Sequence, residues 1–70
     1  MFTQSIKNQI KDYAINNPNE EICGTITFNN NYNVFPCNNI SFNKKENSII
    51  DPLDYIRAEK QGKIVAIYHS

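Results

Sequence analysis

The feature that most constrains the fold is the uninterrupted apolar run of residues 64–67, which Tyr68-His69-Ser70 follows directly. A short run that is rich in β-branched side chains is typical of a strand. Because no polar residue alternates with the apolar ones, we expect both faces of this strand to be covered and the strand to be central in its sheet. A chain of 70 residues can scarcely supply such cover, so we expect the sequence to be cut short.

The first part of the chain predicts an amphipathic helix over residues 3–16. Apolar side chains recur there at helical spacing, with lysine, asparagine and aspartate on the other side. Asn17-Pro18-Asn19 should end the helix, because the residue before a proline avoids helical geometry. The expected apolar face consists of Phe2, Ile6, Ile10, Tyr13 and Ala14.

A β-hairpin is expected next. Residues 22–28 alternate with a period of two and contain several β-branched side chains, which predicts a strand. Residues 32–37 are the expected partner strand, since the asparagines at positions 29–31 form a loop short enough for a hairpin. Pro36 has no backbone N–H, so the second strand should lie at a sheet edge or end there.

A polar loop and a second helix should connect the hairpin to the last strand. In residues 38–47 only Ile40 and Phe42 are apolar, and we expect these two side chains to anchor the loop. Residues 48–50 could add a short strand. Asp51-Pro52 then has the character of a helix start, and Gly62 should end that helix. This order of elements predicts an α+β (mixed α/β) fold.

Composition argues against several classes of partner. Seven basic and seven acidic side chains cancel, and Lys44-Lys45 is the only adjacent basic pair, so we expect no binding of nucleic acid or anionic lipid. No apolar run approaches the roughly 20 residues of a membrane span, and the first residues lack a signal-peptide core. We therefore expect a cytoplasmic protein in which Cys23 and Cys37 remain thiols rather than form the one disulfide open to them.

Two residues of the first predicted strand have more than one interpretation. We favour Cys23 as a small buried hydrophobe, because it lies within a strand pattern and not at a helix start that would lower its pKa. The alternatives are a nucleophile that His69 activates, or a zinc site with Cys37 and His69 that no short Cys-x-x-Cys pair would nucleate. Gly24 marks a close approach of the backbone, either to a substrate lying along the strand or to the first helix.

Glu21 and His69 are ordinary residues when each is taken alone. A solvated glutamate before a strand is common, and so is a hydrogen-bonded histidine at a strand end. Taken together they indicate more, because a histidine at a strand end and an upstream carboxylate are how a zinc hydrolase begins to assemble its site. One histidine, however, cannot hold zinc by itself.

Four segments in order resemble the JAB/MPN (JAMM) metallopeptidase family. The likeness is greatest to its bacterial and phage branch, notably the amino-terminal Mov34/MPN/PAD-1-like domain of phage tail assembly protein K, and it covers residues 20–70. In that family a glutamate before a Cys-Gly strand works beside a His-x-His pair and a Ser-x-x-Asp, with the two histidines and the aspartate on zinc. The matching segments are Glu21-Ile22-Cys23-Gly24, residues 32–39, Ile50-Asp51-Pro52 and residues 62–70.

The resemblance implies a partial MPN-like fold and a zinc-dependent peptidase. Residues 1–70 would then be the amino-terminal portion of a single JAB/MPN-like domain, cut short after the first zinc-binding histidine. Glu21 matches the catalytic glutamate, His69 the first zinc-binding histidine, and Ser70 the residue between the histidines, so that Ser70 and Gly24 would lie close to substrate. Zinc-activated water would then attack a peptide or isopeptide bond of a peptide or protein, with Glu21 as general base. The second histidine and the aspartate have no counterpart in these residues, so we expect this fragment to be inactive alone and to bind zinc only weakly. The resemblance also points to phage tail assembly in a bacterial cell.

A non-enzymatic function is the alternative. The chain could be an MPN-like binding module that buries its last strand against a partner or against a second copy of itself. Residues 64–67 motivate this alternative, because they would otherwise expose an apolar surface.

Overall fold

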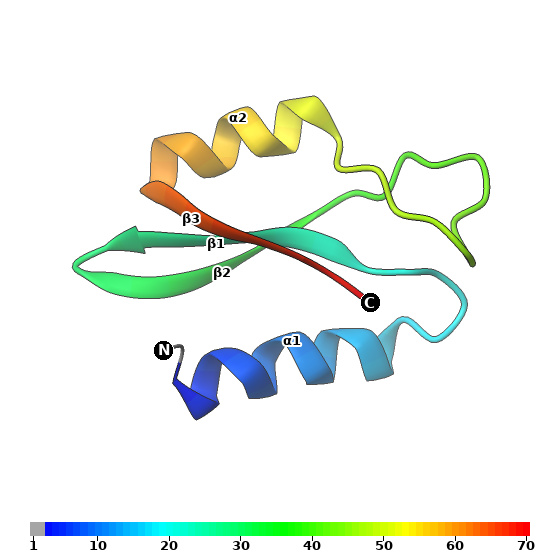
Figure 1. Ribbon diagram of the computed structural model, residues 1–70, viewed down its shortest axis with the longest axis horizontal. Coiled ribbons are helices and arrows are strands. Elements are labelled where there is room, and N and C mark those ends of the chain that lie inside the picture. The colour runs from blue at the N-terminus through cyan, green and yellow to red at the C-terminus, as the bar shows by residue number, and fades with distance from the viewer. Residues whose placement is uncertain (1–2) are drawn as a thin grey trace.

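The computed structural model describes residues 3–70, which form a three-stranded antiparallel sheet and two helices (Figure 1). The strand order is β2-β1-β3, so β1 is central and pairs with both of its neighbours. The predicted α+β fold is therefore confirmed. The elements are α1 (Gln4–Asn16), β1 (Cys23–Asn29), β2 (Asn31–Cys37), α2 (Pro52–Gln61) and β3 (Lys63–His69).

Helix α1 begins and ends close to the predicted positions. The hydroxyl of Thr3 accepts a hydrogen bond from the backbone N–H of Ile6 (3.3 Å), which satisfies one of the N–H groups that the first turn leaves without an intrahelical partner. At the other end, the Asn17 side chain donates to the carbonyl of Tyr13 (2.8 Å). Phe2, which we expected on the apolar face of this helix, lies outside the described residues.

The two helices cover opposite faces of the sheet (Figure 1). On the α1 face, Ile26 lies between its register partners Val34 and Ala66, and all three pack in the apolar core that α1 covers. Thr25 points to the other face, where α2 contacts all three strands and its Ala58 is fully buried. The sheet is therefore the middle layer of three.

Helix α2 has the predicted boundaries. Asp51 is its N-cap, with a carboxylate oxygen that accepts from the backbone N–H two residues ahead (2.9 Å), and Pro52 opens the first turn. Gly62 follows the last helical residue. The carboxylate of Asp54 also accepts a hydrogen bond from the backbone N–H of Asn38 (2.8 Å), which ties α2 to the end of β2. None of the helices in residues 3–70 is both long and apolar enough to span a bilayer.

Strand β3 is not central, and that expectation is wrong. It lies at the edge of the described sheet, where Val65 and Ile67 are 41% and 58% exposed. A shift of register between Ile26 and Thr27 also gives β3 an extra residue, which is a β-bulge. The apolar run reports strand propensity, but it does not show which neighbours cover the strand.

The expected anchors of the polar loop are also wrong. Ile40 is 50% exposed and Phe42 is fully exposed, so neither side chain holds the loop down. Residues 48–50 contribute only an isolated bridge between Asn39 and Ile50 and no longer strand. Polar contacts, instead of apolar ones, hold this segment, and several of these polar contacts are made by the side chain of Asn39.

Candidate functional site

The pairing of β1 with β3 brings the two predicted site segments together. Cys23 lies opposite His69 in the register. One residue further, the Ser70 N–H donates to the carbonyl of Ile22 (3.1 Å), and the Ile22 N–H donates to the Ser70 hydroxyl (3.0 Å). Glu21 directly precedes Ile22 and therefore lies at the same end of the sheet as His69, although the two residues are far apart in the sequence.

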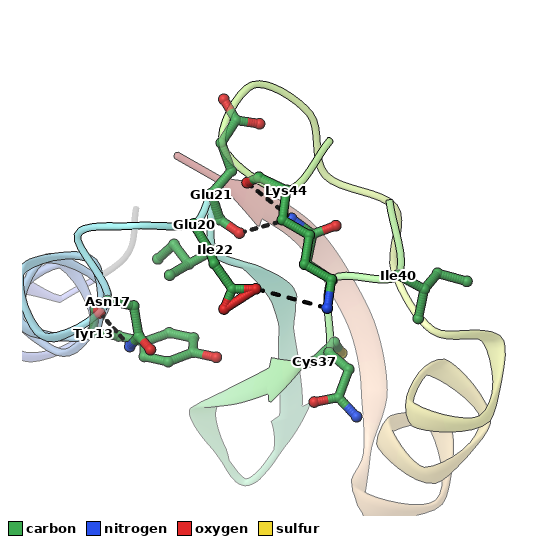
Figure 2. A pocket seen from close by; sticks show the side chains of 10 residues that line it. Tyr13, Asn17, Glu20, Glu21, Ile22, Cys37, Ile40 and Lys44 are labelled. Carbon is green, nitrogen blue, oxygen red and sulfur yellow. Dashed lines mark hydrogen bonds and ion pairs between the residues drawn. The ribbon is translucent and has the colours of Figure 1, made fainter. Parts of the chain in front are cut away.

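The backbone of Glu21 is held on both sides by the segment between β2 and α2. Its N–H donates to the carbonyl of Lys44 (2.6 Å), and its own carbonyl accepts from the side-chain amide of Asn39 (3.0 Å). Figure 2 shows the Glu21 side chain directed away from Tyr13 and Cys37. Among residues 3–70 the carboxylate has no hydrogen-bond or ion-pair partner, so contacts fix the backbone of Glu21 but not its side chain.

Asn39 organises the segment that holds Glu21. Its amide nitrogen donates to three backbone carbonyls and its amide oxygen accepts from two backbone N–H groups, so a single side chain closes the loop on itself and on the start of β1. Sequence analysis missed this role, because nothing distinguishes Asn39 from the many other asparagines in turns. The acceptors are Glu21 (3.0 Å), Asn47 (2.9 Å) and Lys44 (3.5 Å), and the donors are Ser41 (3.0 Å) and Ile49 (3.1 Å).

Two cavities adjoin Glu20 and Glu21. The larger has a volume of about 560 Å³ and contains an exposed ion pair between Glu20 and Lys44 (3.8 Å), which Figure 2 shows and which contributes little to stability. The smaller, about 450 Å³, reaches Ser70. The sheet end that carries the predicted site is therefore hollowed. The larger cavity is lined by Tyr13, Asn17, Glu20, Glu21, Ile22, Cys37, Asn38, Asn39, Ile40 and Lys44.

His69 and Ser70 differ in how their side chains are used. The His69 ring is exposed, and its Nδ1 lies 3.2 Å from the carbonyl oxygen of Ser70. If Nδ1 carries the proton and donates to that oxygen, Nε2 keeps a lone pair for a ligand. The Ser70 hydroxyl already accepts from the Ile22 N–H, so its observed role is to extend the β1–β3 pairing. Its proximity to substrate stays a prediction.

The residues present do not fit a complete zinc site. Within residues 3–70, no three histidine, cysteine, aspartate or glutamate side chains are placed to bind one metal ion. The combination of Cys23, Cys37 and His69 is therefore not formed. The sheet end supplies one imidazole and the Glu21 carboxylate, whereas catalytic zinc takes three protein ligands.

Cys23 is a buried core residue, as we expected. It is 1% exposed, and its thiol donates to the carbonyl oxygens of Cys37 and Asn38 at 3.6 Å each. Burial raises the pKa of this thiol, and the negative charge of Asp54 raises it further. A nucleophilic cysteine needs a lowered pKa, so the environment of Cys23 does not support that role. Both cysteines are free thiols.

Gly24 marks a close approach, but the neighbour is one that we did not predict. Tyr68 is its register partner, and a Cβ on Gly24 would overlap the Tyr68 ring and hydroxyl and the carbonyl oxygen of Phe35. Tyr68 is 8% exposed, and burial raises the pKa of its hydroxyl, which has no hydrogen-bond partner in the described part of the chain. The close contact with Tyr68 thus explains why residue 24 is a glycine, and no substrate is needed for that explanation. The prediction that Gly24 lies near a substrate stays a prediction.

Comparisons with known proteins do not assign this chain to a family. No protein-family model matches it, and searches of curated proteins and of solved structures find no significant match. The resemblance to the JAB/MPN family therefore stays a prediction.

Proposed function

We propose that this chain is the amino-terminal portion of a zinc-dependent metallopeptidase domain of the JAB/MPN type, which hydrolyses a peptide or isopeptide bond. One observation carries the proposal: the register of β1 with β3 places His69 at the same end of the sheet as Glu21. A strand parallel to β1 would have placed His69 at the other end, beside the turn at Asn30. The antiparallel register thus supports a shared site.

In this proposal Glu21 is the general base. It takes a proton from the attacking water and returns it to the leaving amine. Its two backbone hydrogen bonds, with Lys44 and Asn39, suit that task because they fix the backbone from which the side chain extends. His69 serves as one neutral imidazole ligand through Nε2. The remaining two zinc ligands would have to come from residues after Ser70.

The family resemblance extends the proposal to the biological setting. It suggests a peptide or protein substrate, a role in phage tail assembly, and a place in the cytoplasm of a bacterial host cell.

The reading frame and then the zinc content test the proposal. If the coding sequence continues after Ser70, we expect a histidine codon directly behind it and a Ser-x-x-Asp further along. The protein extended through these residues should bind stoichiometric zinc and cleave peptides. A stop codon directly after Ser70, or tight stoichiometric zinc in residues 1–70 alone, would contradict the proposal.

Three variants of the extended protein separate the roles. Glu21→Gln should abolish cleavage but keep the zinc, because the amide cannot accept the proton. His69→Gln should lose both zinc and cleavage. Glu20→Gln is the matched control, since its carboxylate pairs with Lys44 at the surface, and it should retain nearly full activity. Equal losses in Glu20→Gln and Glu21→Gln would remove Glu21 as the base.

A binding function is the second candidate, and the exposed edge of β3 favours it. In the described sheet β3 has a neighbour on one side only, and an apolar edge strand is a template for pairing with another strand. A second copy that pairs antiparallel about Ala66 would set Val65 opposite Ile67 twice, which brings these exposed apolar side chains into cross-strand contact. Sedimentation velocity tests this: a dimer that Ile67→Lys disrupts supports the candidate, and a monomer at all concentrations removes it.

A further inference from the structure

We propose that Cys23 and Cys37 form a modification site, in which glutathione disulfide converts the two thiols into a cross-strand disulfide without a change of strand register. Cys23 is the first residue of β1, Cys37 is the last residue of β2, and the two are direct partners in the ladder. The inference does not depend on the proposed peptidase.

The backbone geometry brings the two cysteines close to the separation that a disulfide needs. The carbonyl of Ile22 accepts a hydrogen bond from Ser70 on the β3 side, so the backbone groups of the next residue, Cys23, point toward β2. Cys23 and Cys37 are therefore a hydrogen-bonded pair, whose Cα atoms lie about 5.5 Å apart in antiparallel sheets. Disulfides span Cα separations of about 4.4–6.8 Å, but they also need Cβ atoms about 3.5–4.5 Å apart. The Cβ atoms of direct partners lie about 4.5–5.5 Å apart, so the ends of the two strands must draw together by about 1 Å while their register stays the same.

The thiols lie on the same face of the sheet, because direct partners in an antiparallel pair project to one side. The Cys23 thiol already lies 3.6 Å from the carbonyl oxygen of Cys37, and the Cys37 thiol lies 3.6 Å from the carbonyl oxygen of Phe35. Rotation about each Cα–Cβ bond, together with this small approach of the strand ends, would exchange these weak hydrogen bonds for the sulfur–sulfur bond.

The larger cavity gives an oxidant a route to one of the two thiols. Cys37 lines that cavity together with Tyr13 and Lys44 (Figure 2), although the residue itself is only 4% exposed. Cys23 is 1% exposed and is not part of the lining. Access therefore makes Cys37 the thiol that reacts first and Cys23 the thiol that resolves the intermediate. Burial raises the pKa of Cys37 to about 11 and also raises the pKa of Cys23, so the exchange runs through a small thiolate fraction and is slow.

The reaction consists of two balanced exchanges. In the first, Cys37 loses its proton, its sulfur bonds to one sulfur of glutathione disulfide, and one glutathione leaves and takes up a proton. In the second, Cys23 loses its proton, its sulfur bonds to the Cys37 sulfur, and the second glutathione leaves in the same way. Two protein thiols are oxidised, and one glutathione disulfide is reduced to two glutathione molecules.

The experiment oxidises the folded 70-residue protein in a glutathione redox buffer and follows intact mass. We expect a monomer that is lighter by two hydrogen atoms, with a peptide map that joins Cys23 to Cys37. Because the bridge closes residues 23–37 in their native register, the melting temperature should rise by roughly 10 °C, and dithiothreitol should reverse the rise. Cys23→Ala and Cys37→Ala are the matched controls, and neither should show the mass loss or the rise.

Two results would overturn the inference. The first is a folded protein that stays a dithiol, or gains only glutathione adducts and intermolecular dimers, while the urea-unfolded chain forms the bridge. The second is a bridged protein with a lower melting temperature, because the native register would then not accommodate the bond. Both readouts use the unmutated chain, so they decide the matter even where an alanine variant fails to fold.

Discussion

The two faces of the sheet differ in the forces that hold their helices. The α1 face is apolar: a buried cluster of isoleucines and Tyr68 joins the helix to the strands. On the α2 face, the buried side chains of β1 are small and partly polar, and two apolar side chains of α2 stay in solvent. The buried residues of β1 on this face are Cys23, Thr25 and Thr27, and the exposed residues of α2 are Leu53 (60%) and Ile56 (50%).

This difference shows where hydrogen bonds, instead of buried apolar side chains, hold the structure together. The segment that leads into α2 is fixed by the side chain of Asn39 and by the contact between Asp54 and the Asn38 N–H. The α1 layer should therefore be most sensitive to the loss of apolar volume, and the α2 layer to the loss of hydrogen-bonding groups. The predicted site lies where the polar segment meets the sheet.

The largest expected effect is on the α1 face. Ile26→Ala should lower the free energy of unfolding by about 3 kcal/mol, because it removes apolar volume from a core position that is 3% exposed. Urea denaturation followed by circular dichroism measures the change. Ile67→Ala, at a position that is 58% exposed, is the matched control and should cost well under about 1 kcal/mol. Equal losses at the two positions would contradict the assignment of the core.

A smaller loss is expected where the α2 side depends on hydrogen bonds. Asn39→Ala removes five side-chain hydrogen bonds and should cost about 2 kcal/mol. The cost stays below the sum of five separate bonds because two amide hydrogens are shared among three carbonyls and water can replace some of the lost partners at this partly exposed site. The Glu21 amide should also exchange its hydrogen faster. Asn43→Ala, which loses a single exposed contact to Glu46, is the control and should have little effect. If both variants behave alike, Asn39 does not organise the segment.

The smallest expected effect is an increase in stability. Thr25 is completely buried on the α2 face, and its hydroxyl has no hydrogen-bond partner among the described residues. Thr25→Val keeps the shape and removes the unsatisfied group, so the free energy of unfolding should rise by about 1 kcal/mol. Thr25→Ser keeps the hydroxyl and loses the methyl group, and it should reduce stability. A loss in Thr25→Val would mean that this hydroxyl does have a partner in solution.

Much of the fold could be predicted from local patterns. The alternation of residues 22–28 and the asparagine loop predicted the β1–β2 hairpin, and Asp51-Pro52 with Gly62 predicted both ends of α2. These signals lie in contiguous residues, and each has a direct physical cause in backbone geometry or in capping.

The remaining features depend on contacts between distant residues. The apolar run of residues 64–67 predicted a strand but not its edge position, which depends on the order of pairing. The roles of Asn39 and of Tyr68 over Gly24 also arise only when separate segments meet. The pair of Glu21 and His69 was proposed from a family resemblance, and their common location depends on the β1–β3 register.

That register can be measured directly, because His69 is the only histidine in the chain. A paramagnetic Cu²⁺ ion added at low concentration binds imidazole and broadens the amide signals of nearby residues in an NMR spectrum. We predict that the amide signals of Glu21 and Ile22 broaden strongly, that those of the turn at Asn30 do not, and that His69→Gln abolishes the difference. Broadening at the turn, or an unaffected Glu21, would contradict a shared site at this end of the sheet.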